Sequence, residues 1–387
     1  MKILHTSDWH IGRILNEFSL LDDQEYILKE MFKVIENEKP DVIIISGDIY
    51  DRSIPPKEAV ELLDRTLTQI IEEYNIPTMI VSGNHDSQER LSFGNELLKH
   101  KQLYIEGMIS NNIKKITMSD EYGLINFYLL PYIHPLVVRD LFNEVSIKDH
   151  QEAFKFLMDK IYENLNTSER NILITHNYII SDLNSIILSD SERSLSCGGI
   201  DYIDASLVEM FDYVALGHLH NYQKVKKDCI RYSGSILKYS FSEANFKKGV
   251  IILDIKEKGK LESRFVELKP KRDLIILEGE LDTLIQKETY QKIDRSSYIL
   301  AILTDSKDLY DPIGRLRAIY PNLMRIQRSN FSINENVKTR ALGDFKNKNE
   351  ITLFSEFYQN ITGNSLDEES IKILHDVINE VIREDKE

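Results

Sequence analysis

The chain has 387 residues, of which 42% are hydrophobic and 29% charged, and its formal net charge is −15. This length predicts a large core and two domains, and the composition is typical of a globular protein. The acidic charge argues against a protein that coats nucleic acid through a broad basic face, but it is compatible with an enzyme whose bound cations meet a phosphate.

Short apolar runs alternate with helical stretches along the N-terminal part of the chain. The runs contain few polar residues, which is typical of strands buried on both faces by helices or by a second sheet. The pattern predicts an α/β fold. In chain order, we expect a strand at 1–4, a helix at 23–36, a strand at 42–45, a helix at 56–74, and strands at 77–81, 172–174, 213–216 and 249–255.

A second, smaller unit is expected after the basic stretch 269–272. Strand-like runs mix there with one short helical stretch, which indicates an α+β domain, and polar, irregular residues then indicate a linker. The tail has two helical stretches, of which the second carries an apolar stripe. We therefore predict a main domain at 1–268, an α+β domain at 269–330, a linker at 331–350 and a C-terminal helical segment at 351–387.

The sequence shows no targeting or membrane segment. Met1 is followed at once by the first strand-like run, and no apolar run approaches the roughly 20 residues that a membrane-spanning helix needs. The two cysteines, Cys197 and Cys229, fit neither a metal-binding spacing nor a disulfide framework. We therefore expect a cytoplasmic protein with reduced thiols and no membrane association.

Polar clusters follow five of the apolar runs. The carboxyl ends of strands in α/β sheets are where ligands bind, so these clusters should meet at one rim. Asp8 and His10 are one residue apart, as two side chains on the same side of a strand would be. The residues predicted to lie at this rim are Asp8, His10, Asp48, Asn84, His176, His218 and His220.

This set suits a pair of divalent cations. Two cations about 3.5–4 Å apart can clamp a phosphate and activate a water, and they need a bridging carboxylate, for which Asp48 is our candidate. Mixed nitrogen and oxygen donors favour Mn, Fe or Zn over an all-oxygen magnesium site. Taken singly, Asp48 could instead cap a helix, Asn84 could sit in a turn, and any one histidine could be structural.

The order of the clusters resembles that of the calcineurin-like metallophosphoesterases. Within that superfamily the chain is most similar to the bacterial nuclease subunits related to the double-strand-break repair nucleases. The resemblance covers about residues 1–270, and is carried by HTSDWHIGR (5–13), GDIYDRSIPP (47–56), SGNHDS (82–87), LPYIHP (130–135), His176, ALGHLHNYQ (215–223) and YSGSILKYSFSEA (232–244). It implies a β-sandwich flanked by helices, with a small α+β capping domain and C-terminal helices.

The family's ligand pattern carries over without a gap. The resemblance implies that Asp8, His10, Asp48 and His220 hold one cation, and that Asp48, Asn84, His176 and His218 hold the other. It places His85 beside the scissile phosphate, as general acid or transition-state donor, with Asp86 orienting it. Asp51 stands where archaeal and eukaryotic relatives have a histidine. It either orients a ligand or His85, or only caps the next turn.

The function that the resemblance implies is a DNA nuclease with two divalent cations, manganese being expected. The activities would be 3'-5' double-strand exonuclease and single-strand or hairpin endonuclease. Arg13 and Arg52 are candidate phosphate contacts, or else solvated surface charges. A nucleotide or small-molecule phosphodiesterase is the alternative, whereas GDIYDRS and GNHDS differ from the GDxxDRG and GNHE of the protein phosphatases.

The resemblance also implies partners. The chain would form a homodimer that joins an SMC-like ATPase with a long coiled coil, docked by the C-terminal helices, although packing of those helices on their own chain stays open. The sequence lacks a G-x-x-x-x-G-K-[ST] loop, so ATP should bind to the partner. Because the chain is acidic, strong binding of duplex DNA should need the whole complex.

Overall fold

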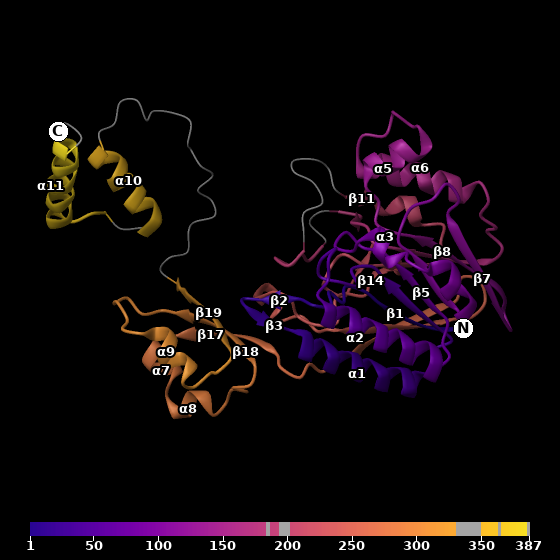
Figure 1. Cartoon of the computed structure of the whole chain (residues 1–387), viewed down its shortest axis with the longest axis horizontal. Coiled ribbons are helices and arrows are strands. Elements are labelled where there is room, and N and C mark those ends of the chain that lie inside the picture. Colours follow the sequence, from indigo (N-terminus) through magenta and orange to yellow (C-terminus); the bar gives the residue numbers. More distant parts are fainter. Residues whose placement is uncertain (183–185, 193–201, 330–349, 363–364, 385–387) are drawn as a thin grey trace. The chain divides into compact units, whose positions relative to one another are not determined.

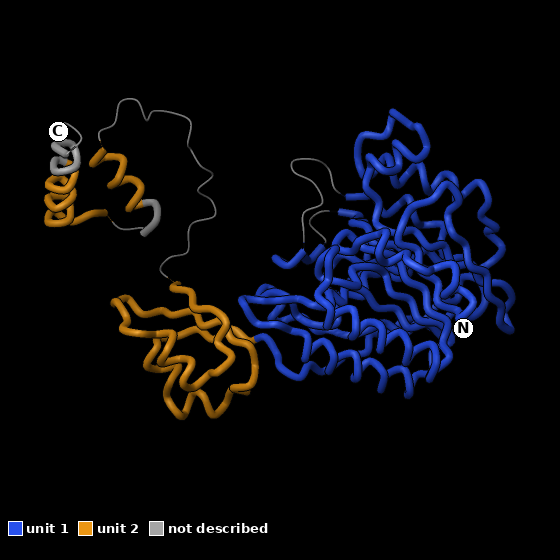
Figure 2. Tube along the Cα trace, viewed as in Figure 1, with its two compact units in different colours: residues 1–274 blue, residues 275–387 orange. Residues whose placement is uncertain are grey.

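The computed structural model describes residues 1–182, 186–192, 202–329, 350–362 and 365–384 (Figure 1). The chain forms two compact units, residues 1–274 and 275–387 (Figure 2). Cys197 and all but the last residue of the predicted linker lie outside the described residues. Within the described part, no helix has the length and apolar character needed to cross a membrane.

The first unit contains two six-stranded sheets. In the first sheet, β1, β4, β5 and β6 are parallel neighbours, and β15 and β16 continue the sheet antiparallel beyond β1. The strands, in sheet order, are β16 (Leu261–Glu267), β15 (Gly249–Ile255), β1 (Lys2–Thr6), β4 (Val42–Ser46), β5 (Thr78–Val81) and β6 (Leu103–Glu106).

The second sheet has a parallel centre, in which β14, β12, β9 and β8 run side by side, and an antiparallel strand at each edge. Its strands, in sheet order, are β13 (Gln223–Val225), β14 (Lys227–Tyr232), β12 (Tyr213–Leu216), β9 (Arg170–Thr175), β8 (Gly123–Leu130) and β7 (Lys114–Asp120).

The two sheets pack face to face, and helices cover their outer faces. Ile44 of the first sheet and Phe127 of the second belong to one buried cluster between the sheets. Side chains alternate along a strand, so Val214 of β12 lies on the other face of the second sheet. There it belongs to a second buried cluster, to which α6 contributes Phe154. Figure 1 shows α1 and α2 along one side of the unit and α5 and α6 at another. This is the predicted sandwich flanked by helices.

The helices of this unit start and end close to where the apolar periodicity does. The helix expected at 56–74 is an α-helix that continues as a π-helical turn at Gln69–Glu73. The α-helices are α1 (Leu21–Glu38), α2 (Lys57–Thr68), α3 (Gln88–Leu91), α4 (Asn95–Leu98), α5 (Pro135–Phe142) and α6 (His150–Tyr162). Short strand pairs are β2 (Ile14–Leu15) with β3 (Phe18–Ser19), and β10 (Ile179–Ile180) with β11 (Ile203–Asp204).

The second unit has its own small core. A three-stranded sheet packs on short helices around Ile299, Leu316 and Tyr320. Its elements are β17 (Leu274–Gly279), α7 (Leu281–Leu284), α8 (Lys287–Tyr290), β18 (Tyr298–Leu303), α9 (Pro312–Arg317) and β19 (Leu323–Arg328), followed by α10 (Glu350–Thr362) and α11 (Glu368–Glu384). The strands and helices expected from the sequence are therefore present, and the domain boundaries at 268 and 330 remain a prediction.

Candidate metal centre

The carboxyl ends of β1, β4 and β5 in one sheet, and of β9 and β12 in the other, carry the predicted ligands. Four of these residues have a left-handed backbone, with φ of 53° at Asp8, 44° at His10, 50° at Asp48 and 108° at His218. Such a conformation costs a non-glycine residue about 1–3 kcal/mol and persists only where the surroundings enforce it. The fold therefore keeps strain where the chain leaves its sheets, which is typical of a functional site.

Backbone hydrogen bonds hold the turns after β1 and β4 together. Asp8 N donates to Gly47 O over 3.0 Å, and His10 N donates to Asp48 O over 3.0 Å. Gln24 of α1 fixes the same turn from behind, since its Nε2 donates to His10 O over 2.7 Å. These bonds place two carboxylates and an imidazole side by side.

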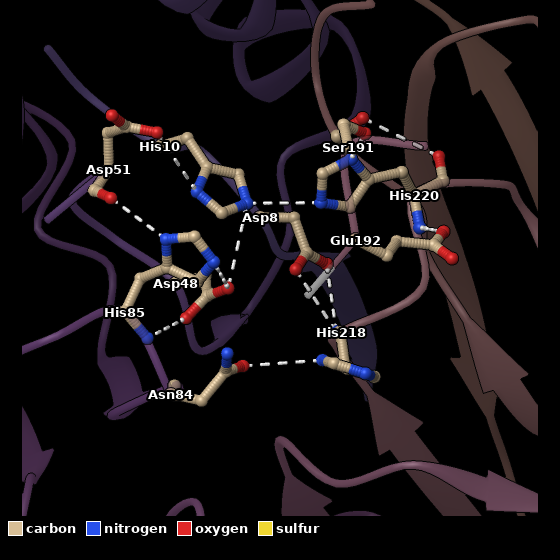
Figure 3. Close-up of polar contacts among 12 residues, drawn as sticks. Asp8, His10, Asp48, Asp51, Asn84, His85, Ser191, Glu192, His218 and His220 are labelled. Carbon is tan, nitrogen blue, oxygen red and sulfur yellow. Dashed lines mark hydrogen bonds and ion pairs between the residues drawn. The ribbon is translucent and has the colours of Figure 1, made fainter. Parts of the chain in front are cut away.

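One group of donor atoms gathers around His10 and His220. The two Nε2 atoms are 3.1 Å apart, and His10 Nε2 lies 3.6 Å from Asp48 Oδ2 (Figure 3). The ligand atoms of Asp8, His10 and His220 all lie within 4.8 Å of one another. Two nitrogens bound at about 2.1 Å and at right angles to one cation would be about 3 Å apart. This group, Asp8, His10, Asp48 and His220, is called the first donor group.

A second donor group, Asp48, Asn84, His176 and His218, lies beside it. Asn84 Oδ1 is 3.1 Å from His176 Nε2 and 3.3 Å from His218 Nδ1. His176 Nε2 is 3.4 Å from Asp48 Oδ2. The two groups therefore share Asp48 Oδ2. The structure brings all seven predicted ligands together in this arrangement.

Electrostatics explain why this buried cluster suits cations. Burial opposes ionisation of Asp48, but His176 and His85 beside it hold the pKa of that carboxyl well below its usual range. Burial also disfavours charge on His176, yet Asp48 raises the pKa of this ring to about 9. Without a cation the two groups thus share a proton, which a divalent cation can replace. Burial lowers the pKa of His218 to about 3, which keeps that ring in the neutral form that binds metals.

Further contacts orient the imidazoles. His176 Nδ1 donates to Ser46 O over 2.8 Å, so its Nε2 faces Asn84 and Asp48. His220 Nδ1 lies 2.7 Å from Ser191 Oγ and 3.3 Å from Glu243 Oε1, so its Nε2 faces His10. Contacts of this kind fix the tautomer of a metal-binding histidine and strengthen its donor atom.

His85 lies next to the shared carboxylate. Its Nδ1 is 2.8 Å from Asp51 O, and its Nε2 is 3.9 Å from Asp48 Oδ2. The Asp86 carboxylate accepts hydrogen bonds from the backbone N–H groups of Ile49, Tyr50 and Gly83. Asp86 therefore orients the turns that carry Asp48 and Asn84, whereas the contact that orients the His85 ring comes from the Asp51 backbone.

The two predicted arginines differ in their surroundings. Arg13 Nη1 is 2.6 Å from Asp51 Oδ1 and its side chain is largely buried. Arg52 is 57% exposed, and its Nε lies 3.6 Å from Asp51 Oδ2. The Asp51 carboxylate is also 4.0 Å from His10 Nδ1, a buried nitrogen without a hydrogen-bond partner among the described residues. Asp51 thus stands between the first donor group and both guanidinium groups.

Sequence reasoning missed the residues that surround His220. Glu243, Lys248, Ser191 and Glu192 all contact this histidine, and Gln24 supports His10. A weak signal existed, because Glu243 lies in the quoted motif YSGSILKYSFSEA at 232–244. Nothing in the local pattern of Ser191 or Glu192 distinguishes them from ordinary loop residues.

Fold and site together define a metallophosphoesterase. Residues 1–222 match the family described as Calcineurin-like phosphoesterase, and residues 270–362 match the Type 5 capsule protein repressor C-terminal domain. The chain belongs to the calcineurin-like phosphoesterases, so the fold class expected from the motifs is confirmed. The mixed histidine, carboxylate and amide donors of the site fit the divalent cations that such a protein uses.

Within the calcineurin-like phosphoesterases, curated relatives identify the family of this chain as the SbcD subunits of the SbcCD nuclease. The chain is 38% identical to the SbcD protein of Staphylococcus epidermidis over 376 residues, which cover 97% of each chain. It is 35% identical to the SbcD protein of Staphylococcus saprophyticus over 389 residues, 99% of each chain. The chain belongs to this family, as the motifs predicted. Among solved structures, a dimetal phosphatase from Danio rerio is 12% identical with a TM-score of 0.39, over 70% of this chain and 99% of that one.

Proposed function

We propose that the protein is the nuclease subunit of a DNA-processing complex and hydrolyses DNA phosphodiester bonds with two divalent cations. One observation carries the proposal: two buried donor groups share Asp48 Oδ2, in a chain that is related over its whole length to nuclease subunits. When bound, two cations would activate a water and stabilise the charge that develops on the phosphate.

The chain's own residues would position the reaction. The first donor group would hold one cation, the second donor group the other, and Asp48 both. His85 Nδ1 donates to Asp51 O, so Nε2 is the atom that can deliver a proton to the leaving oxygen when the ring is protonated. Asp86 would act by accepting backbone hydrogen bonds, and Asp51 by binding Arg13. Neither would act at the phosphate itself.

Manganese is the cation that we propose. The substrates would be DNA ends and hairpins, cut by 3'-5' exonuclease and single-strand endonuclease activity. The protein would act in the cytoplasm. Arg52, exposed beside Asp51, would contact backbone phosphate. Residues 269–330 would form the capping domain.

The C-terminal segment 351–387 would dock an SbcC-type ATPase subunit. Its helices α10 and α11 leave large apolar side chains exposed, which a partner would cover. These are Phe354, Phe357, Ile371, Ile373 and Val377.

The homodimer that we propose would use an apolar face of the first unit. Phe93, just after α3, is 86% exposed and lines one groove together with Val60 of α2, and Leu97 of α4 is 76% exposed. An exposed apolar face of this kind favours association with a second copy.

The decisive experiment compares the purified chain with its His85→Gln variant on end-labelled duplex and hairpin DNA in manganese, with and without the ATPase partner. Exposed His100→Gln is the matched control, and bis-p-nitrophenyl phosphate is tested in parallel. We expect the wild type and control to cut DNA, while the His85 variant binds manganese and does not cut. If the small ester is hydrolysed but DNA is not cut, even with the partner, the proposed metal site would stand. The proposed function would then change from a nuclease to a small-molecule or nucleotide phosphodiesterase.

A further inference from the structure

A short segment of irregular chain, residues 186–192, runs beside the turn that carries His220; we call it the strap. Its Ile187 exchanges two hydrogen bonds with the Gln223 side chain, both of 3.0 Å. Asp190 N donates to Ser242 Oγ over 3.1 Å. The strap is therefore attached to two separate parts of the first unit, the first residue of β13 and the helical turn Phe241–Glu243.

Ser191 of the strap bonds directly to the His220 ring. The Ser191 hydroxyl donates to the Glu243 carboxylate, which can only accept. Ser191 Oγ must then accept the hydrogen of His220 Nδ1, 2.7 Å away. This chain of bonds leaves the Nε2 lone pair of His220 facing the first donor group (Figure 3).

Lys248 provides the counter-ion for Glu243, which lies at the far end of this series of hydrogen bonds. Glu243 is fully buried, and its Oε2 lies 2.5 Å from Lys248 Nζ. Lys248 Nζ also donates to His220 O over 2.7 Å. A buried carboxylate with its own counter-ion is thus dedicated to the His220 turn.

Glu192 fixes the backbone of the same histidine. Its Oε1 accepts the hydrogen of His220 N over 2.7 Å, and its Oε2 accepts that of Ser189 N over 3.0 Å. The strap therefore holds His220 by both its ring and its backbone. Among the described residues between β9 and β12, hydrogen bonds to His220 come from the strap alone.

We propose that the strap is a positioning element of the first donor group: Ser191, backed by Glu243 and Lys248, presents His220 Nε2 to the cation there. The proposal rests on the metal-binding function above and adds residues outside the ligand set. Because coupling between two equilibria is reciprocal, a strap that strengthens cation binding must itself be held more firmly when the cation is bound.

The test measures manganese binding by equilibrium dialysis with metal analysis, for the wild type, Ser191→Ala, Ser191→Thr and Thr66→Val. Thr66 is the control, because it is a buried residue of α2 whose hydroxyl, among the described residues, bonds to the helix backbone at Leu62 O alone. Loss of an outer contact typically costs about 10- to 100-fold in metal affinity. We expect Ser191→Ala to lose that much at one of two sites, Ser191→Thr to restore it, and Thr66→Val to match the wild type.

Amide hydrogen exchange of residues 186–192 provides a readout that does not depend on activity. Manganese should slow exchange there in the wild type and do so less in Ser191→Ala. Two wild-type sites that Ser191→Ala leaves unchanged, with exchange in the strap insensitive to manganese, would overturn the proposal while the metal site stands. A wild type that binds no manganese would overturn both the strap proposal and the proposed function.

Discussion

The Nε2 atoms of His10 and His220 face each other over 3.1 Å, although 210 residues separate them in the chain. The His220 ring uses its Nδ1 hydrogen toward Ser191, so its Nε2 offers a lone pair to the space that it shares with His10. Burial lowers the pKa of His10 well below that of a free histidine, so the His10 ring is neutral and can bind a cation. Two imidazoles held in this orientation provide two of the four ligands of a cation site before any cation arrives.

The shared position of Asp48 predicts that its loss affects both cations. Asp48→Asn removes a charge that lies 3.6 Å from His10 Nε2 and 3.4 Å from His176 Nε2. We expect affinity at both sites to fall by more than the about 10- to 100-fold that loss of an outer contact costs. Asn84→Ala should weaken only one site, because its oxygen contacts two members of the second donor group, His176 and His218. Manganese bound per chain checks this, and two retained cations in Asp48→Asn would exclude Asp48 as the shared ligand.

A backbone position near the site predicts a loss of metal binding without any change of ligand. A Cβ atom on Gly83 would lie 2.0 Å from Asp48 Oδ1 and 2.4 Å from Asp48 N, so Gly83→Ala must displace the shared carboxylate. Overpacking of this kind typically costs about 1–3 kcal/mol. We expect Gly83→Ala to fold with reduced stability and to bind manganese poorly at both sites.

The matched control is Gly259→Ala, at a glycine with φ of 80° and open space around it. Its backbone strain should lower stability by about 1–2 kcal/mol but leave manganese binding intact. Equal manganese affinity in the two variants would show that the close approach of Gly83 to Asp48 has no functional consequence.

The sequence predicts that the seven ligand candidates lie at one rim because each follows a buried strand, and parallel neighbours such as β4 and β5 bring their carboxyl ends together. It could not place Glu243 or Ser191, because their contacts with His220 depend on how separate turns pack rather than on any local period. The same limit applies to Asp86, expected beside the His85 ring but bonded to backbone N–H groups of two turns. Local patterns thus predict which strands carry chemistry, whereas supporting contacts require the tertiary structure.

The exposure of Arg52 predicts a contribution to DNA binding that depends on salt. Because Arg52→Gln removes one phosphate-binding charge, it should weaken duplex binding by the assembled complex and reduce the slope of log affinity against log salt by about one. Lys260→Gln is the control, because it removes one exposed charge at the turn after β15, whose last residues pair with the first residues of β1, away from the rim. Identical salt slopes for wild type, Arg52→Gln and Lys260→Gln would assign Arg52 to solvated surface charge.

An ion pair between buried Arg170 and partly exposed Asp120, far from the rim, predicts how stability changes with acid. Arg170 is 2% exposed and donates two hydrogen bonds to Asp120, which also lies 2.9 Å from the Met1 amino group. Arg170 therefore holds the pKa of Asp120 below its usual range. For a carboxyl whose pKa is lower in the folded state, the stabilisation is complete above its unfolded pKa of about 3.9 and disappears as pH falls through the folded value.

We therefore expect Asp120→Asn, with a native N-terminus, to lose about 1–3 kcal/mol of unfolding free energy at pH 7, because Arg170 is left without its carboxylate. The difference from wild type should shrink below pH 4, where the wild-type pair begins to be lost. Trp9, the single tryptophan, is buried in the first unit, so its fluorescence during urea unfolding reports on this unit alone. Asp140→Asn, in an exposed pair with Arg139, should change stability by less than about 1 kcal/mol. A difference between Asp120→Asn and wild type that grows in acid would mean that the carboxylate destabilises the fold, contrary to the geometry.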